Sequence, residues 1–429
     1  MLVFLEGVSL VFRCIILTWG TIVLIHNFII KRKIVKIQYW KILILFLFSC
    51  LVTTFLHMGD NFLPNLLAVY HTAICFFIFY GMSAETSKEK IEKEMSVISK
   101  AIVVMTTVLN ILGLLIFVVK VQLNIGEYWL GIFNNRFIGL YTNSNLLALS
   151  SVLAIIGCHL LISDKIPGEE KKTGKKKALY VTAVFFNFAA LILSDSNASF
   201  LFLIIYITVV LFYHLFSQRN KIPVKEIFKK SCILLLCCLT LTILSFELRG
   251  ICQDGIASLI NDVHRSEEPI HDNRPAPEAV EIGREHYDVS SGRITLLKQA
   301  MQMYRYHPIM GVGRGNIVEY GERLIPGGLI FSDFHNGYVT ILVSWGMVGF
   351  FIFIALSILV AIDMCRSLFQ KDFKEDSGIF PCLFAMVVAY CIYSLFEKTI
   401  LSEITFMVVM FWLILGYSMT YVKEKGNKI

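Results

Sequence analysis

The residues best suited to chemistry lie near the start of a long apolar segment in the last third of the chain. Asp333, His335 and Asn336 stand directly before it. An imidazole titrates near neutral pH, so His335 could orient or deprotonate a hydroxyl nucleophile. Asp333 and Asn336 could fix the tautomer of that imidazole or position the hydroxyl group. Alternatively, His335 only caps the apolar helix that follows. We take the three residues as catalytic candidates.

Several arginines could bind a phosphate or diphosphate, because the guanidinium group forms paired hydrogen bonds with phosphate oxygens. Arg293 begins a helix-compatible run, and Arg136 precedes a polar turn that contains Asn145 and opens an apolar run. A helix N-terminus at that turn would add backbone donors for an anion. Arg249 and Arg314 are further candidates. The alternative for each is an arginine that only reaches toward the membrane interface.

The glycine-rich turn Gly311–Asn316 follows the run that Arg293 begins. A nucleotide-binding loop would need a preceding strand and a βαβ unit, which this part of the sequence lacks. We therefore interpret Gly311, Gly313 and Asn316 as a tight turn that lets the backbone approach a ligand or another helix. The histidines show no metal-ligand spacing, so we expect neither a metal nor a cofactor.

These residues must be positioned by membrane helices. The chain has 429 residues, of which 56% are hydrophobic, whereas soluble proteins average roughly 45–50%. Apolar runs of about 20 residues are typical of membrane spans, and the sequence predicts an all-α integral membrane protein with about eleven (10–12) of them. The predicted spans are residues 8–30, 42–58, 64–82, 101–121, 144–163, 179–194, 199–216, 231–247, 338–362, 380–396 and 402–421.

Charged residues predict the sidedness of these spans. Most of the 39 Lys and Arg residues lie in alternate connections and in the tail after residue 421, which places those segments and the C-terminus in the cytoplasm and the N-terminus outside. The net charge of +7 thus follows from topology and does not indicate nucleic-acid binding. The opposite face carries mainly Arg, including the candidates above. We predict a multi-pass protein of a bacterial cytoplasmic membrane.

This topology divides the chain into an N-terminal bundle (1–246), a large extracytoplasmic loop (247–337) and a C-terminal bundle (338–429). The middle of the loop is polar and rich in proline. Its second half predicts an amphipathic helix that Ser290 or Ser291 caps and that Pro308 ends. The predicted apolar face consists of Ile294, Leu297, Met301 and Tyr304.

The order of these motifs resembles the O-antigen ligase and polymerase superfamily, which consists of integral membrane glycosyltransferases of the C-type fold. The motifs are R-x-x-G with N-x-N from Arg136, S-G-R with HP-x-x-G-x-G-x-G-N from Ser291, and H-N-x-Y with G-x-x-G from His335. The resemblance covers residues 136–350. It implies a donor glycan on undecaprenyl pyrophosphate, transferred at the outer leaflet without nucleotide sugar or obligatory metal.

The resemblance also implies residue roles. His335 matches the essential histidine of the large loop, Arg293 the arginine that opens its amphipathic helix, and Arg136 the arginine before the paired asparagines. One position departs from the pattern. Many members have S-R-G-A where this chain has Ser194–Ala198 (SDSNA), so Asn197 cannot supply a cation. Arg249 or Arg314 would then substitute, or the pyrophosphate is held differently.

Several functions fit these features. We favour a polymerase that transfers a glycan from undecaprenyl pyrophosphate to the hydroxyl of an acceptor glycan, with a chain-length regulator and a flippase as possible partners. A ligase that transfers a finished glycan uses the same motifs. A peptidoglycan polymerase would use a loop carboxylate, which Asp333 could supply. A lipid-linked oligosaccharide flippase would predict related halves with broken helices, and none is visible in the sequence. A scaffold would leave the His–Asn pair without a role.

Overall fold

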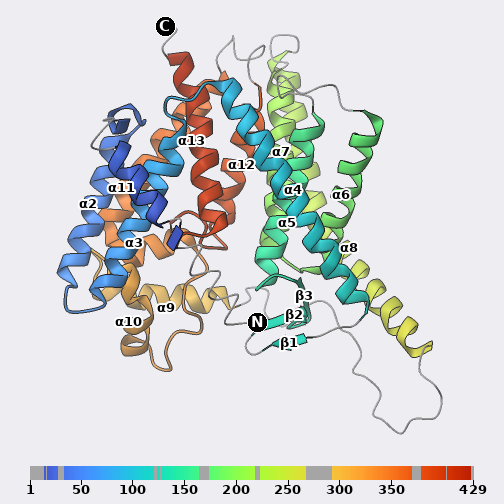
Figure 1. The fold of residues 1–429 in the computed structure, drawn as a ribbon, viewed down its shortest axis with the longest axis horizontal. Coiled ribbons are helices and arrows are strands. Elements are labelled where there is room, and N and C mark those ends of the chain that lie inside the picture. Colours follow the sequence, from blue (N-terminus) through green and yellow to red (C-terminus); the bar gives the residue numbers. More distant parts are fainter. Residues whose placement is uncertain are drawn as a thin grey trace. The chain divides into compact units, whose positions relative to one another are not determined.

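The fold of the chain is predominantly helical (Figure 1). The computed structural model describes residues 14–15, 17–27, 33–119, 123–125, 128–163, 173–217, 223–266, 292–369, 378–401 and 403–426. Its main helices are α2 (Trp40–Leu56), α3 (Phe62–Ile74), α4 (Lys88–Val118), α5 (Ser144–Ile162), α6 (Gly174–Leu193), α7 (Asn197–Ser217), α8 (Val224–Ser266), α9 (Arg293–Tyr306), α10 (Ile317–Leu324), α11 (Gly337–Phe369), α12 (Phe380–Tyr393) and α13 (Phe406–Gly426).

Long apolar helices confirm that the protein is membrane-embedded. Within the described residues, seven helical segments are long and apolar enough to cross a bilayer, and three shorter apolar helices, α2, α12 and α13, accompany them. These ten segments coincide with the ten predicted spans from residue 42 onward. Of the first predicted span, residues 8–30, the structure describes 14–15 and 17–27, and no helix there is long enough within the described residues to count as a span, so the total of eleven stays a prediction.

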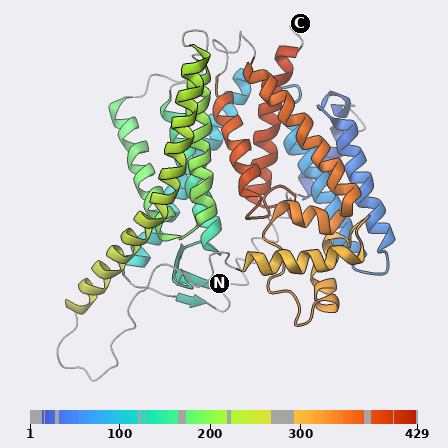
Figure 2. The same cartoon turned by 180° about the vertical axis from the view of Figure 1, so that it is seen from behind.

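The chain folds as two compact units that differ from the three-part division by topology. The first unit comprises Val3–Ile91 with Asp288–Ile429, and the second comprises Glu92–Tyr287. In the first unit, α2, α3, α11, α12 and α13 form a bundle, and α9 lies across one end of it (Figures 1 and 2). The boundaries at residues 246 and 337 describe sidedness rather than packing, and they stay predictions.

Hydrogen bonds within the first unit connect segments that the Lys and Arg distribution predicted to lie on the cytoplasmic side. The Tyr39 hydroxyl donates to Asp363 at 2.5 Å, and the Thr420 hydroxyl donates to the Ser83 carbonyl at 3.0 Å. These contacts join the start of α2, the short 3-10 turn Gly81–Ser83 that follows α3 along the chain, and the far parts of α11 and α13. The candidate residues before α11 belong to its other end. This arrangement is what alternating sidedness requires, although the direction of insertion stays a prediction.

Helix α11 is broken at Gly346, whose φ of 63° is incompatible with a continuous helix. Four backbone hydrogen bonds to the segment before α10 satisfy groups at the break, which would otherwise lack partners inside a membrane protein. They run from Val312 N to Val343 O (3.0 Å), Gly313 N to Ser344 O (2.9 Å), Met347 N to Pro308 O (2.8 Å) and Val348 N to Ile309 O (3.1 Å).

This break corrects the expectation of unbroken spans. Gly311 has φ 75°, and a Cβ there would lie 2.4 Å from the Ser344 carbonyl oxygen, so only glycine allows this contact. The predicted close approach of the turn to a helix is therefore confirmed. The part of α11 after the break, residues 347–369, measures about 35 Å at 1.5 Å per residue, which is enough to cross a bilayer alone. The shorter part before the break places His335.

Helix α9 forms where the sequence predicted it, but with a different buried face. Its buried side chains are Leu296, Gln299, Ala300 and Met303, and two of these join a core with Val312, Ile317, Ile325, Phe334 and Val343. Ile294 and Leu297 of the predicted apolar face stay outside this core and are 59% and 48% exposed. Apolar residues thus occupy two faces of α9, and only one of them packs against the bundle. The helix starts after Gly292 with φ 76°, and the proposed caps Ser290 and Ser291 lie outside the described residues.

The second unit contains three short strands that the all-α prediction lacks. These are β1 (Leu123–Ile125), β2 (Tyr128–Phe133) and β3 (Arg136–Gly139), which pair in antiparallel order β1-β2-β3. Asn134 and Asn135 join β2 to β3 with φ of 50° and 56°, the conformation that a two-residue hairpin requires. Asn-Asn between two apolar runs was the available signal. This hairpin places Arg136 at the first position of β3.

Helix α8 corrects the predicted start of the large loop. The helix continues to Ser266, because no proline interrupts residues 248–266 and the glycines there do not end it. Arg249 and Gln253 therefore lie on a helix, and Gln253 Nε2 donates to the Ile192 carbonyl at the end of α6 at 2.8 Å. Most of the polar, proline-rich stretch lies outside the described residues. Of the predicted loop, the structure describes residues 247–266 and 292–337.

Candidate functional site

The first unit collects six charged or polar side chains in front of α11. We call this group the His335 cluster, and it comprises Arg293, Asp333, His335, Asn336, Glu397 and Lys398. Helix α9 supplies Arg293, the segment before α11 supplies the three residues found by sequence, and the connection between α12 and α13 supplies the last two. The structure thus brings Arg293 and the predicted catalytic residues into one place.

The backbone of His335 is held in an unusual conformation. Its φ is 46°, in the left-handed region that non-glycine residues rarely adopt. Strain of this kind costs about 1–3 kcal/mol and concentrates at functional sites. Asp333 Oδ1 accepts a hydrogen bond from the His335 N–H at 2.8 Å. The surroundings therefore impose the direction of the imidazole.

Asn336, and not His335, is the residue that caps α11. Its Oδ1 accepts hydrogen bonds from the N–H groups of Tyr338 and Val339, each at 3.0 Å, as an N-cap does. Its Nδ2 donates to the Leu395 carbonyl at 2.9 Å. Both ends of this amide are thus used within the protein. Asn336 orients the neighbouring histidine through the backbone.

The His335 imidazole faces two carboxylates. Its Nδ1 lies 3.3 Å from Glu397 Oε2 and 3.6 Å from Asp333 Oδ1. The hydrogen bond to Glu397 and the charges of both carboxylates raise the pKa of His335 above its ordinary value, although burial and Arg293 oppose them. A carboxylate at Nδ1 favours the tautomer whose Nε2 can accept a proton. The arrangement suits a general base.

The two carboxylates differ in their cationic neighbours. Lys398 Nζ lies 2.6 Å from Asp333 Oδ2. Although burial raises the pKa of Asp333, the contact with Lys398 and the nearby His335 lower it overall. Asp333 is therefore ionised and engaged with two partners. This environment favours a structural role for Asp333 over a role as the catalytic carboxylate.

Glu397 and Lys398 are the site residues that sequence reasoning missed. They follow the tenth predicted span, far along the chain from His335, and belong to none of the motifs. The signal available was an adjacent acidic and basic pair at the outer end of a span, where charges are rarely incidental. Only folding places Glu397 between His335 and Arg293, whose NH2 lies 3.9 Å from Glu397 Oε1.

Arg293 has guanidinium N–H groups without a hydrogen-bond acceptor in the described chain. Its Nε is buried and has no partner, and its guanidinium makes no hydrogen bond within the described part of the chain. The group packs over the Phe396 ring at 5.7 Å. The buried Nε–H is costly to leave without an acceptor, while the rest of the guanidinium is partly exposed. An anionic ligand would satisfy them.

Arg314 and the glycine turn occupy a different place in the first unit. Gly311 and Gly313 pack against the break in α11, and the Asn65 Oδ1 accepts the Gly315 N–H at 2.7 Å. Asn316 Nδ2 donates to the Val312 carbonyl at 2.7 Å, so Asn316 closes the turn. Arg314 lines a hollow beside Ser344. These residues shape the backbone behind the His335 cluster.

A second polar group lies in the second unit, around the connection between α6 and α7. Arg136 Nε donates to the Ser194 carbonyl at 2.9 Å, and its NH2 donates to Asn145 Oδ1 at 2.8 Å. Ser196 Oγ donates to the same Asn145 oxygen at 3.0 Å. The hairpin of β2 and β3 and the start of α5 thus place Arg136 and Asn145 together, as their shared motif suggested. We call this group, with the residues of the next paragraph, the Arg136 cluster.

Arg249 brings a cation to the position where Asn197 lacks one. Its NH2 donates to Asn197 Oδ1 at 2.5 Å and lies 3.0 Å from Asp195 Oδ1. Arg249 is 6% exposed and packs against the rings of Phe200 and Phe246. Of the two arginines suggested as substitutes, Arg249 is therefore the one beside Asn197, and Arg314 belongs to the other unit.

No candidate metal centre emerges from the described ranges. No three His, Cys, Asp or Glu side chains in these ranges could hold a metal ion together. The histidines at 271 and 286 lie outside these ranges. The expectation that the protein uses neither metal nor cofactor stays a prediction.

One comparison with known proteins gives a match. Residues 182–354 match a family model described as O-antigen ligase, which confirms the resemblance drawn from the motifs. Members of that family are glycosyltransferase-like enzymes. The match includes Arg249, Arg293 and His335, whereas Arg136 and Glu397 lie outside it. No curated protein matches the chain significantly.

Proposed function

We propose, from the premise that residues 182–354 match the O-antigen ligase family model, that the chain is a polysaccharide polymerase of the cell membrane. Its donor would be a glycan on undecaprenyl pyrophosphate, and its acceptor the sugar hydroxyl of a second glycan. The proposal rests on one observation above others. Glu397 lies between Arg293 and His335. Arg293 makes no hydrogen bond within the described chain, and His335 has the Glu397 carboxylate at Nδ1.

In the proposed reaction, the acceptor hydroxyl attacks the anomeric carbon of the donor sugar. A new C–O bond forms while the bond from that carbon to the diphosphate oxygen breaks. The hydroxyl proton passes to His335 Nε2, and Glu397 stabilises the imidazolium that results. Arg293 stabilises the charge that develops on the leaving polyprenyl diphosphate. Each such donor is typically worth a few kcal/mol in the transition state.

The ligase is the second candidate, and the description of the matching family favours it. Both reactions use the same donor and the same base, so the His335 cluster fits either one. A flippase is less well supported. Although α11 is broken, four backbone bonds engage groups at its break, whereas transporters leave such ends open toward substrate.

Analysis of lipid-linked glycans from a strain lacking the protein would separate these functions. We expect single repeat units on the lipid, because a polymerase acts before chains grow. Long lipid-linked chains that never reach an acceptor would instead identify a ligase. Repeat units confined to the inner leaflet would contradict both and support a flippase. Complementation with the unaltered chain is the control.

We predict that Glu397 sets the pH dependence of the reaction. His335 acts as a base only when neutral, so activity should rise with pH through its pKa. Glu397 raises that pKa. In Glu397→Gln, the pKa should fall, which moves the rising limb of the kcat/KM profile to lower pH. The plateau should also fall, because the imidazole loses its orienting partner.

A structural role alone would lower the plateau without moving this limb, so the pH profile of the purified enzyme is the deciding measurement. Glu322→Gln serves as the matched control, since this carboxylate lies on α10 and is exposed. An unshifted limb in Glu397→Gln would contradict the proposed pairing with His335.

We also propose that Arg249 is the cation of the Arg136 cluster that replaces the arginine missing at Asn197. Arg249→Ala should reduce transfer and stability together, because the nearly buried Asp195 loses its cationic partner at 3.0 Å. Adding Asn197→Arg should restore part of both, since Asn197 lies within hydrogen-bond distance of the Arg249 guanidinium. Thermal unfolding and polymer length measure the two effects. Restored stability without restored transfer would show that Arg249 is only structural.

A further inference from the structure

Four buried polar atoms near the glycine turn have no hydrogen-bond partner within the described residues. They are Asn65 Nδ2, Arg314 Nε, Asn316 Oδ1 and Ser344 Oγ. Folded proteins leave few such atoms unsatisfied, and each one calls for a water, an ion or a ligand. Their concentration around one turn therefore marks a place where something polar binds.

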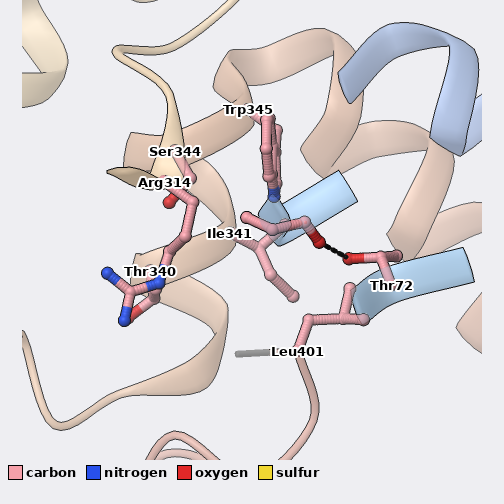
Figure 3. A pocket seen from close by; sticks show the side chains of 8 residues that line it. Thr72, Arg314, Thr340, Ile341, Ser344, Trp345 and Leu401 are labelled. Carbon is pink, nitrogen blue, oxygen red and sulfur yellow. Dashed lines mark hydrogen bonds between the residues drawn. The ribbon is translucent and has the colours of Figure 1, made fainter. Parts of the chain in front are cut away.

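Two of these atoms belong to side chains that line one hollow in the first unit. Figure 3 shows Arg314, Thr340 and Ser344 along one side of it and Thr72 across from them. Ser344 is 1% exposed, so its hydroxyl has no route to bulk water except this hollow. The volume open to water-sized groups is about 10 Å³, which is close to the space that one water needs.

The available hydrogen-bonding groups determine the kind of ligand. The hydroxyls of Thr72 and Thr340 already donate to the carbonyls of Ala68 (2.9 Å) and Asn336 (2.8 Å). The Ser344 hydroxyl and the Arg314 guanidinium have no hydrogen bond and remain as donors. Donors with a positive charge suit an oxyanion and exclude a cation.

The charge of Arg314 has no direct counter-ion in the described chain. Carboxylates of Glu403 and Asp333 act on it from a distance, and Asp333 is already paired with Lys398 at 2.6 Å. Arg314 is half-buried, and its buried Nε–H is costly to leave without an acceptor. A bound oxyanion would remove this cost.

We propose that Arg314 and Ser344 form an oxyanion subsite that receives one phosphoryl oxygen of a lipid-bound phosphate. The inference rests on the proposed function for its source, the diphosphate of the polyprenyl donor. The size of the hollow admits one oxygen, so the remainder of the diphosphate stays outside. Arg314 thereby binds the donor from the side of the broken helix, and Arg293 binds it beside His335.

Binding of inorganic pyrophosphate to the purified full chain in phosphatidylcholine nanodiscs tests the subsite. We expect Arg314→Gln to weaken this binding by about 10- to 100-fold, the range for a charged hydrogen bond. Ser344→Ala should weaken it by a smaller factor, and Arg314→Lys should fall between, because it keeps the charge but loses the planar fork. Arg323→Gln is the matched control, since Arg323 is exposed and paired with Glu319. Unchanged affinity in Arg314→Gln and Ser344→Ala would overturn the proposal and leave a site for water.

The same measurement separates the two possible sources of the phosphate. If the subsite serves the donor, phosphatidylglycerol in the nanodiscs will not compete with pyrophosphate. Competition that disappears in Arg314→Gln would instead assign the subsite to phospholipid headgroups and overturn the donor assignment. His335→Ala should bind pyrophosphate normally and fail to transfer glycan. If His335→Ala transfers normally while Arg314→Gln loses binding, the proposed function fails and the subsite stands.

Discussion

Replacing His335 with alanine is expected to abolish polymer formation while the protein still inserts into the membrane. The change removes the proposed general base, a contribution typically worth about 100- to 10,000-fold in rate. The change should cost little packing energy, because the His335 side chain is partly exposed. The cap of α11 is also kept, since Asn336 provides it. The measurement is glycan transfer by purified protein, beside polymer length in complemented cells.

His214→Ala is the matched control, because this histidine lies in the last turn of α7, at the end of the helix opposite to Asn197. Thermal unfolding of the His335 variant should stay close to that of the unaltered protein. Normal transfer by a folded His335→Ala protein would refute the assignment of the base. Loss of folding would call for His335→Gln, which keeps the volume and lacks a titrating group.

The second large effect is expected at Arg293. Arg293→Gln removes a guanidinium that makes no hydrogen bond in the described chain, so the loss should appear in catalysis rather than in stability. Removal of one such donor typically lowers kcat by about 100- to 1,000-fold. Arg293→Lys should recover only part of this, since an ammonium cannot form paired hydrogen bonds with a phosphate.

Arg305→Gln is the control for Arg293, because Arg305 lies on the same helix and is exposed. Kinetics with a lipid-linked donor would separate donor binding from catalysis. A variant that lowers kcat alone has lost an interaction of the transition state, and one that raises KM alone has lost ordinary binding. Equal activity of Arg293→Gln and Arg305→Gln would remove Arg293 from the mechanism.

The motifs pointed to several residues that the structure places in the two clusters, but most contacts between distant segments are not visible in the motifs. Arg136 and Asn145 share a motif, and their hydrogen bond follows from a short hairpin. The position of Arg249 beside Asn197 depends instead on the packing of α8 against α7, over many intervening residues. The sequence around each residue does not predict this contact, because Arg249 and Asn197 lie on different helices and neither belongs to a motif that includes the other.

The break in α11 shows a similar division. The predicted span 338–362 contains Gly346 and Gly349, and it still predicts an uninterrupted helix, since glycine is common within membrane helices. Its φ of 63° at Gly346 depends on the turn at Gly311, which supplies partners for the backbone groups at the break. Neither glycine indicates the break alone. The pair does so only when the two segments meet.

By itself, the sequence determined that this protein is helical and membrane-embedded, and that a histidine and several arginines stand at the ends of its spans. Apolar length and charge are local properties, and the bilayer translates them directly into helices and sidedness. The tertiary structure alone decided that Glu397 joins His335 to Arg293, that Arg249 reaches Asn197, and that the glycine turn enters the break in α11. These contacts link segments distant in sequence, so side-chain packing rather than periodicity creates them.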